Sequence, residues 1–199
     1  MKKFALLGLG LCCIGSTHAG FELDRFQTRF GLTQIEPKNN PGNLDDGTRT
    51  NVSNAYALTT DFVYFLTPNL AVDLLVGSAP KHNIYGDGQK IGNTKYIPPT
   101  LSLQYNFNPQ GQWNPYVGLG VNYTYYFDEN LLNGQKLDVS NSTGVAATIG
   151  MDYKLNEHFS LGTDIRYVDV NSDVKINGVK VGNVDVNPML YSLTLGYKF

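Results

Sequence analysis

The last fifteen residues, Asp185 to Phe199, read DVNPMLYSLTLGYKF and guide the interpretation of the whole chain. Every second residue from Met189 to Phe199 is apolar or aromatic, whereas the residues between them are mostly small or polar. Strict alternation with a period of two is typical of a β-strand whose two faces meet different environments. Such an apolar face can pack either in a protein core or against lipid. The sequence of the rest of the chain decides between these two environments.

Residues 1–19 have the pattern of a cleaved secretory signal peptide. A basic start precedes an apolar run, and Thr17-His18-Ala19 forms a small-residue cleavage site. Both cysteines of the chain, Cys12 and Cys13, lie in this segment. We therefore expect a mature protein, residues 20–199, without disulfides, thiol nucleophiles or thiolate metal sites.

The composition excludes several classes of protein. The whole chain has a formal net charge of −2, and loss of the signal peptide removes two lysines, so the mature protein is a poor general binder of nucleic acid. After residue 19 there is no apolar run long enough for a membrane-spanning helix. Because only helices and closed barrels satisfy every backbone group in lipid, an integral membrane protein with this sequence has to be a β-barrel.

Seven further stretches alternate like the last one, which gives eight predicted strands. The connections between them are alternately long and short, as in outer-membrane barrels with long external loops and short periplasmic turns. Tyr and Phe gather near the strand ends, as the two interfacial belts of such a barrel require. We predict an all-β, eight-stranded antiparallel transmembrane β-barrel of residues 20–199, with four long external loops and both termini in the periplasm. The expected strands cover about residues 20–37, 52–66, 70–79, 96–107, 115–127, 143–155, 159–170 and 185–199.

Four segments resemble the OmpW family of eight-stranded outer-membrane proteins: Ile97-Pro98-Pro99-Thr100-Leu101, residues 114–124 (NPYVGLGVNYT), Gly150-Met151-Asp152-Tyr153 and Gly196-Tyr197-Lys198-Phe199. The resemblance implies a monomer in the outer membrane, surrounded by lipid and lipopolysaccharide, with a narrow, partly hydrophobic interior. It also implies binding or passage of small hydrophobic molecules, and in some members reception of phage or bacteriocin. The terminal aromatic-x-Phe resembles the signal by which the barrel assembly machinery recognises its clients, which assigns that role to Phe199.

The strand faces opposite the apolar ones carry charged and amide side chains that are expected to point into the lumen. They form either a constriction that selects what crosses or a plug of ion pairs. Because eight strands leave a lumen that side chains about fill, and buried charges need partners, the plug is favoured. Apolar cargo would then leave sideways, and Pro98 and Pro99, which cannot donate ladder hydrogen bonds, mark a candidate lateral opening or a simple kink. The channel-lining or plug candidates are Arg29, Asp61, Asp73, Gln104, Asp152, Asp164 and Arg166.

Two alternative functions stay open at this point. An enzyme needs a nucleophile or activated water beside a base, and His82 and His158 are expected at opposite ends of the barrel, so no enzyme, cofactor or metal is predicted. A surface protein would act through its external loops as an adhesin or receptor, and its lumen would carry nothing. An apolar pocket in the upper lumen would favour transport over this alternative. Its candidate lining residues are Ile84, Leu75, Leu190, Ile91, Leu131 and Leu132, with Tyr56 expected to point outward.

Overall fold

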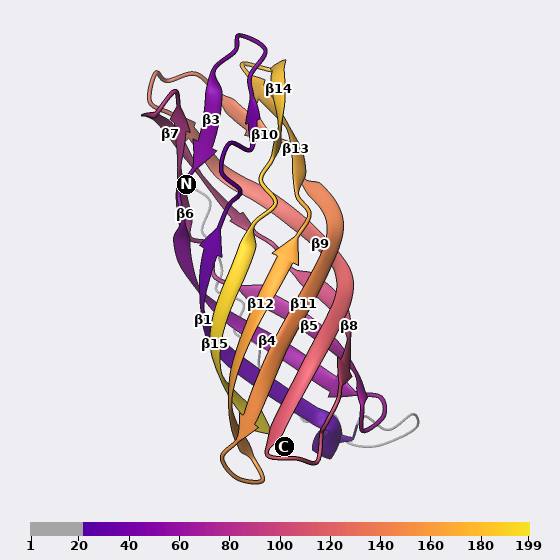
Figure 1. Ribbon diagram of the computed structural model, residues 1–199. Coiled ribbons are helices and arrows are strands. Elements are labelled where there is room, and N and C mark those ends of the chain that lie inside the picture. The colour runs from indigo at the N-terminus through magenta and orange to yellow at the C-terminus, as the bar shows by residue number, and fades with distance from the viewer. Residues whose placement is uncertain (1–21) are drawn as a thin grey trace.

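Residues 22–199 of the computed structural model are described; the predicted signal peptide lies outside the described residues. Within them, a single 3-10 turn, Leu23–Arg25, leads into a closed barrel of eight strands in the order β11-β12-β15-β1-β4-β5-β8-β9, with β9 pairing back to β11 (Figure 1). All neighbours are antiparallel. The barrel strands are β1 (Phe26–Glu36), β4 (Ala55–Phe65), β5 (Leu70–Gly77), β8 (Thr100–Asn106), β9 (Trp113–Leu131), β11 (Ser142–Lys154), β12 (Phe159–Val168) and β15 (Met189–Lys198).

The C-terminal strand closes the barrel against the first strand. β15 pairs with β1 from Gln27–Lys198 to Glu36–Met189, and pairs with β12 on its other edge. Closure leaves no free edge in the barrel, so the backbone groups of each strand meet a partner. The predicted all-β, eight-stranded antiparallel architecture is confirmed. Residues 22–199 contain no helix long and apolar enough to cross a membrane.

The outer surface of the barrel is apolar and the inner surface is polar. Leu58, Leu119 and Leu193 are each at least 70% exposed, whereas Arg29 is 1% exposed. A soluble barrel would bury its apolar face, so this distribution resolves the choice left open by the alternation in favour of lipid. Rings cluster where the short turns lie, among them Phe26, Phe199 and Tyr197, with centroids 5.0–5.5 Å apart. They form one interfacial belt, and that end is called the periplasmic end.

The expected external loops are largely folded into strands, which corrects the prediction of loops in these regions. Asp87-Gly88 and Asn177-Gly178 have positive φ and form tight hairpin tips. The predicted strand 96–107 is divided between β7 and β8, and β9 continues four residues beyond its expected end at 127. Figure 1 shows these additional strands rising above the barrel at the end opposite the short turns. They are β2 (Gly42–Asn43), β3 (Arg49–Val52), β6 (Lys81–Gly86), β7 (Gln89–Ile97), β10 (Leu137–Val139), β13 (Asn171–Ile176) and β14 (Val179–Asp185).

The additional strands form two groups that meet across the top of the lumen. β7, β6, β3 and β2 continue outward from β9, and β10, β13 and β14 form a separate three-stranded sheet. The groups touch at an isolated bridge between Leu44 and Gly182 and at a hydrogen bond from Asp185 N to Pro41 O (2.7 Å). Buried apolar residues line the space that they enclose, and this core continues into the barrel through residues such as Ile35, Leu75 and Leu190 on the barrel strands.

Candidate functional site

A buried cluster of charges crosses the lumen between β12 and the strands on the opposite wall. Nη2 of Arg166 donates to Oδ1 of Asp61 (3.1 Å) on β4 and to Oδ2 of Asp73 (2.9 Å) on β5. All three side chains are at most 3% exposed. Asp164, two residues before Arg166 on β12, is also buried. One guanidinium therefore ties β12 to the paired strands β4 and β5 across the lumen.

A second buried pair extends the cluster toward the periplasmic end. Arg29 on β1 donates from Nη2 to Oδ2 of Asp152 (2.9 Å) on β11, and from Nη1 to Oε1 of Gln104 (3.2 Å) on β8. Its guanidinium lies over the ring of Tyr116, 4.5 Å from the centroid. Gly150 permits this arrangement, because a Cβ there would come within 2.3 Å of the Tyr116 ring. We call the residues Arg29, Asp61, Asp73, Gln104, Tyr116, Asp152, Asp164 and Arg166 the lumen cluster.

The structure places all seven candidate lumen residues inside the barrel and brings six of them into two bonded groups, one around Arg29 and one around Arg166. Tyr116 was not singled out from the sequence, although its parity with Gly118 and Gly120 on β9 already put it on the inner face. The lumen cluster holds four carboxylates and two guanidiniums. Its formal charge is therefore negative, which disfavours the passage of anions.

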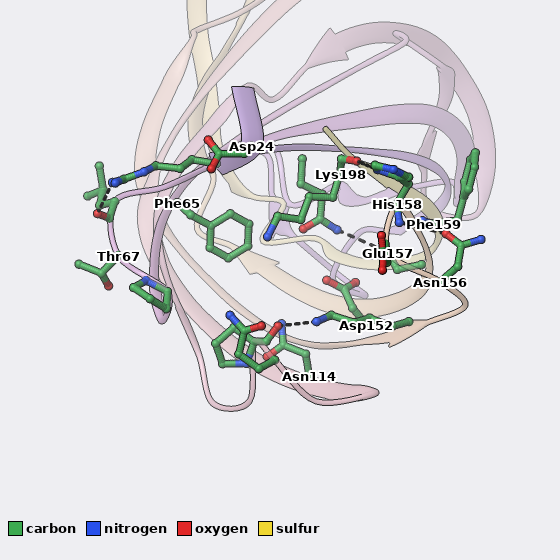
Figure 2. A pocket seen from close by; sticks show the side chains of 18 residues that line it. Asp24, Phe65, Thr67, Asn114, Asp152, Asn156, Glu157, His158, Phe159 and Lys198 are labelled. Atoms are coloured by element: carbon green, nitrogen blue, oxygen red, sulfur yellow. Dashed lines mark hydrogen bonds between the residues drawn. The ribbon is translucent and has the colours of Figure 1, made fainter. Parts of the chain in front are cut away.

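A cavity of about 400 Å³ opens at the periplasmic end (Figure 2). Asp152 lines it and also holds Arg29, so the lumen cluster forms its inner end. Lys198 lies over the ring of Phe65, 5.5 Å from the centroid, and both side chains face the same cavity. The cavity is lined by both polar and apolar side chains, which suits a water-filled vestibule.

A second cavity lies at the external end and is lined by apolar side chains and a few hydroxyls. It measures about 60 Å³, and both groups of additional strands contribute to its walls. We call it the external pocket. Of the candidates, Ile84, Ile91 and Leu131 line it, Leu75 and Leu190 belong to the buried core, and Leu132 is 66% exposed. The expectation that Leu132 lines the pocket is therefore wrong. The full lining is Pro41, Leu44, Thr50, Val52, Ile84, Ile91, Thr94, Tyr96, Tyr126, Leu131, Leu137, Val139, Val174, Ile176, Val184 and Val186.

Pro98 and Pro99 separate β7 from β8 just below the external pocket. The pairing of β5 with β8 ends at Leu75–Thr100, and the pairing of β6 with β7 begins at Lys81–Lys95. On the other side, β9 holds the two prolines. Tyr123 N donates to Pro99 O (3.0 Å), and Nδ2 of Asn122 lies 3.0 Å from Pro98 O and 3.1 Å from Pro99 O. The interruption thus faces β5 and β6.

His82 on β6 packs beneath the external strands and outside the membrane-spanning barrel. Its ring stacks on Tyr96 with centroids 4.6 Å apart, and Nδ1 donates to the Ser53 carbonyl oxygen (2.8 Å). Burial lowers the pKa of His82 below its ordinary value. His158 lies in the turn at the opposite end of the barrel, stacked on Tyr197. In residues 22–199, no group of three or more His, Cys, Asp or Glu side chains is arranged to hold a metal ion.

A closed eight-stranded barrel with an apolar belt outside and a charged lumen inside defines an integral β-barrel protein of the outer membrane. The particular family follows from comparison with known proteins. The model of the OmpW family matches residues 23–199, and the chain belongs to this family.

Relatives and solved structures agree with this assignment over most of the chain. Outer membrane protein W of Salmonella typhi is 32% identical over the whole of both chains. The crystal structure of OprG from Pseudomonas aeruginosa superposes with a TM-score of 0.81 at 31% identity, covering 87% of this chain and 95% of that one. PahQ of Pseudomonas aeruginosa, a dibenzothiophene metabolism operon protein, is 30% identical over 80% of this chain and 76% of its own length. The protein is thus located in the outer membrane.

Proposed function

We propose that the protein admits small hydrophobic molecules from outside the cell through the external pocket and releases them sideways into the outer membrane. The observation that carries this proposal is the position of an apolar pocket directly above a charged, buried lumen cluster. An apolar solute gains free energy on entering the pocket and would lose it on entering the cluster. The downward path is therefore unfavourable for such a solute.

The lateral exit is supported by the interruption at Pro98-Pro99. The prolines have no N–H to donate, and the registered pairing on the β5 and β6 side stops below and resumes above them. Tyr96, two residues before Pro98, lines the external pocket, so the pocket reaches the strand that the prolines end. The name of PahQ, which refers to the metabolism of an apolar fused aromatic compound, is consistent with this class of solute.

The external pocket has to widen for transport. Its volume of about 60 Å³ is that of about two water molecules, whereas ligand pockets typically measure about 300–1,000 Å³. Widening is simplest where the two groups of additional strands meet, at the Leu44–Gly182 bridge. We infer that separation of these groups admits the solute.

The experiment measures uptake by proteoliposomes of an apolar fluorescent molecule and a polar one of similar size, with empty liposomes as the control. A double variant, Asn43→Cys with Asn183→Cys, places two exposed cysteines beside the bridge in a chain whose residues 22–199 contain no other cysteine. We expect the protein to accelerate the apolar molecule selectively. Oxidation of the double variant should reduce uptake to the level of empty liposomes, and a reductant should restore it.

The single variants Asn43→Cys and Asn183→Cys are the matched controls, because together they carry both surface changes of the double variant without a crosslink. Equal acceleration of both molecules would contradict a hydrophobic path. Undiminished uptake by the fully oxidised double variant would contradict entry between the two strand groups. No acceleration of either molecule by the wild-type protein would favour a surface or receptor function of the external loops.

A further inference from the structure

A completely buried histidine packs beside the external pocket, and one of its ring nitrogens has no partner. His82 on β6 is 0% exposed. Its Nδ1 bonds the Ser53 carbonyl oxygen (2.8 Å), which only accepts, so the neutral ring carries its proton on Nδ1. Nε2 has no hydrogen-bond partner within residues 22–199. A second proton on Nε2 would create a buried charge whose new N–H meets no acceptor, so the closed arrangement holds the ring neutral.

The same ring fastens one wall of the external pocket. Ser53 directly follows β3 and is tied to β6 by two bonds besides that of His82: Ser53 N donates to Asn83 O (2.9 Å), and Asn83 N donates to Ser53 Oγ (2.9 Å). The His82 ring also stacks on Tyr96 of β7, with centroids 4.6 Å apart. Side chains of β3, β6 and β7 all line the pocket, so His82 joins the three strands that form this wall.

No opposite charge faces the ring to compensate a second proton. The titratable side chains on the adjoining strands are Tyr96, Tyr126, Lys81, Lys95 and Asp128. The two tyrosines are uncharged near neutral pH, and the lysines and the aspartate lie on the outer surface, where Lys95 pairs with Asp128 (2.8 Å). Burial lowers the pKa of His82, the bond to Ser53 raises it, and none of the charged groups in residues 22–199 contributes to the shift.

We propose that His82 is a pH-sensitive switch of the external pocket, whose protonation favours an open arrangement in which β7, β6, β3 and β2 move away from β10, β13 and β14 and the ring meets water. This inference rests on the proposed function, because it assigns a regulation to the pocket through which solutes enter. An equilibrium between two arrangements shifts toward the one that binds the proton more tightly. Since His82 lies among the external strands, the pH that it senses is that outside the cell.

The size of the shift follows from the protonation of one group. The closed arrangement keeps the ring neutral, whereas the open one gives His82 its ordinary pKa of about 6.5. Lowering the pH from about 7.5 to 5.5 therefore raises the ratio of open to closed protein about tenfold, and by no more than about tenfold per pH unit.

The test follows the exposure of a buried position in the pocket wall as the pH changes. Val184→Cys places a thiol at a lining position that is 8% exposed, in a chain whose residues 22–199 contain no other cysteine. Its rate of labelling by a water-soluble thiol reagent is divided, at each pH, by that of the exposed Asn43→Cys, which removes the pH dependence of the reagent itself. We expect this ratio to rise about tenfold between pH 7.5 and 5.5.

His82→Phe, made in the Val184→Cys protein, keeps an aromatic ring to stack on Tyr96 and removes the titratable group. His158→Phe is the matched control, because it makes the same change to the other histidine of residues 22–199, which stacks on Tyr197 at the periplasmic end. The labelling ratio should stay within about twofold between the two pH values in His82→Phe and should rise as in the parent protein in His158→Phe. Uptake of the apolar fluorescent molecule by proteoliposomes is measured at the same two pH values.

A labelling ratio that does not change with pH in the Val184→Cys protein, or that rises equally in His82→Phe, would overturn the switch. A rise that begins only below about pH 5 would also overturn it, because carboxylates titrate there, and this measurement needs no variant of His82. A rise in labelling that is lost in His82→Phe, without any uptake of the fluorescent molecule, would support the acid-sensitive opening and refute the proposed function.

Discussion

Removing Arg166 tests whether the lumen cluster closes the barrel. Nη2 of this residue lies 3.1 Å from Oδ1 of Asp61 and 2.9 Å from Oδ2 of Asp73, and all three side chains are buried. In Arg166→Ala the two carboxylates keep their positions but lose their cation. We expect the variant to be less stable and to conduct more ions than the wild-type protein.

The magnitude follows from what is left behind. Removing one partner of a buried ion pair costs about 3–5 kcal/mol, because the remaining charge stays desolvated and unpaired. Two carboxylates share the lost guanidinium here, so we expect a loss at the upper end of this range. The lumen would then hold four carboxylates and one guanidinium, Arg29. The added conductance should therefore be selective for cations.

Unfolding in urea, followed by the mobility shift between folded and unfolded barrels in electrophoresis, gives the stability, and planar bilayers give the conductance. The matched variant combines Arg166→Met with Asp61→Asn and Asp73→Asn, which removes the charges but keeps most of the volume. It should recover most of the stability and stay closed. An Arg166→Ala barrel within about 1 kcal/mol of wild type, with unchanged conductance, would refute the reasoning.

Two further changes address the external half of the barrel. Asn122→Ala removes the amide that holds Pro98 O and Pro99 O, so uptake of an apolar molecule should accelerate, whereas slower or equal uptake would argue against an exit at the prolines. Acidification should destabilise the protein, because the pKa of His82 is lower in the folded state than its ordinary value of 6.5 and the unfolded state then binds more protons. The free energy of unfolding should therefore fall as the pH drops below about 6.5. His82→Phe keeps the stacking on Tyr96 and should flatten this pH dependence in thermal unfolding between pH 7.5 and 5. An equal slope in both proteins would exclude His82 as the source of the dependence.

Local sequence patterns suffice for the direction of the side chains in the barrel strands. The alternation in β15 and β9 predicted which side chains face outward, because side-chain direction in a strand depends only on the local backbone. The loops were predicted less well. Residues 80–95 carry several Gly and polar residues and were expected to be a loop, yet they contain β6 and most of β7. β7 pairs with β9, which extends further than its turn signals indicated, and β6 pairs with β7.

For the seven candidate lumen residues, too, the local pattern predicted the inner face of the strand but not the partners in space. Parity alone indicates that Asp61, Asp73 and Arg166 share the lumen, but not that one guanidinium nitrogen holds both carboxylates. Tyr96 and Tyr126 were not identified as lining residues, because the external pocket lies between strands and neither β7 nor β9 forms it alone. The continued period of two beyond residue 125 was the available signal for Tyr126.

The sequence by itself determined the eight barrel strands, their inner and outer faces and the lipid environment, since these follow from a period of two and from the rhythm of long and short connections. Only the tertiary structure decided which charges pair and where the apolar pocket lies. Arg166 is separated by 105 residues from Asp61 and by 93 from Asp73. Such partners are set by the closure and stagger of the barrel, which depend on all eight strands together and which no local stretch of the chain encodes.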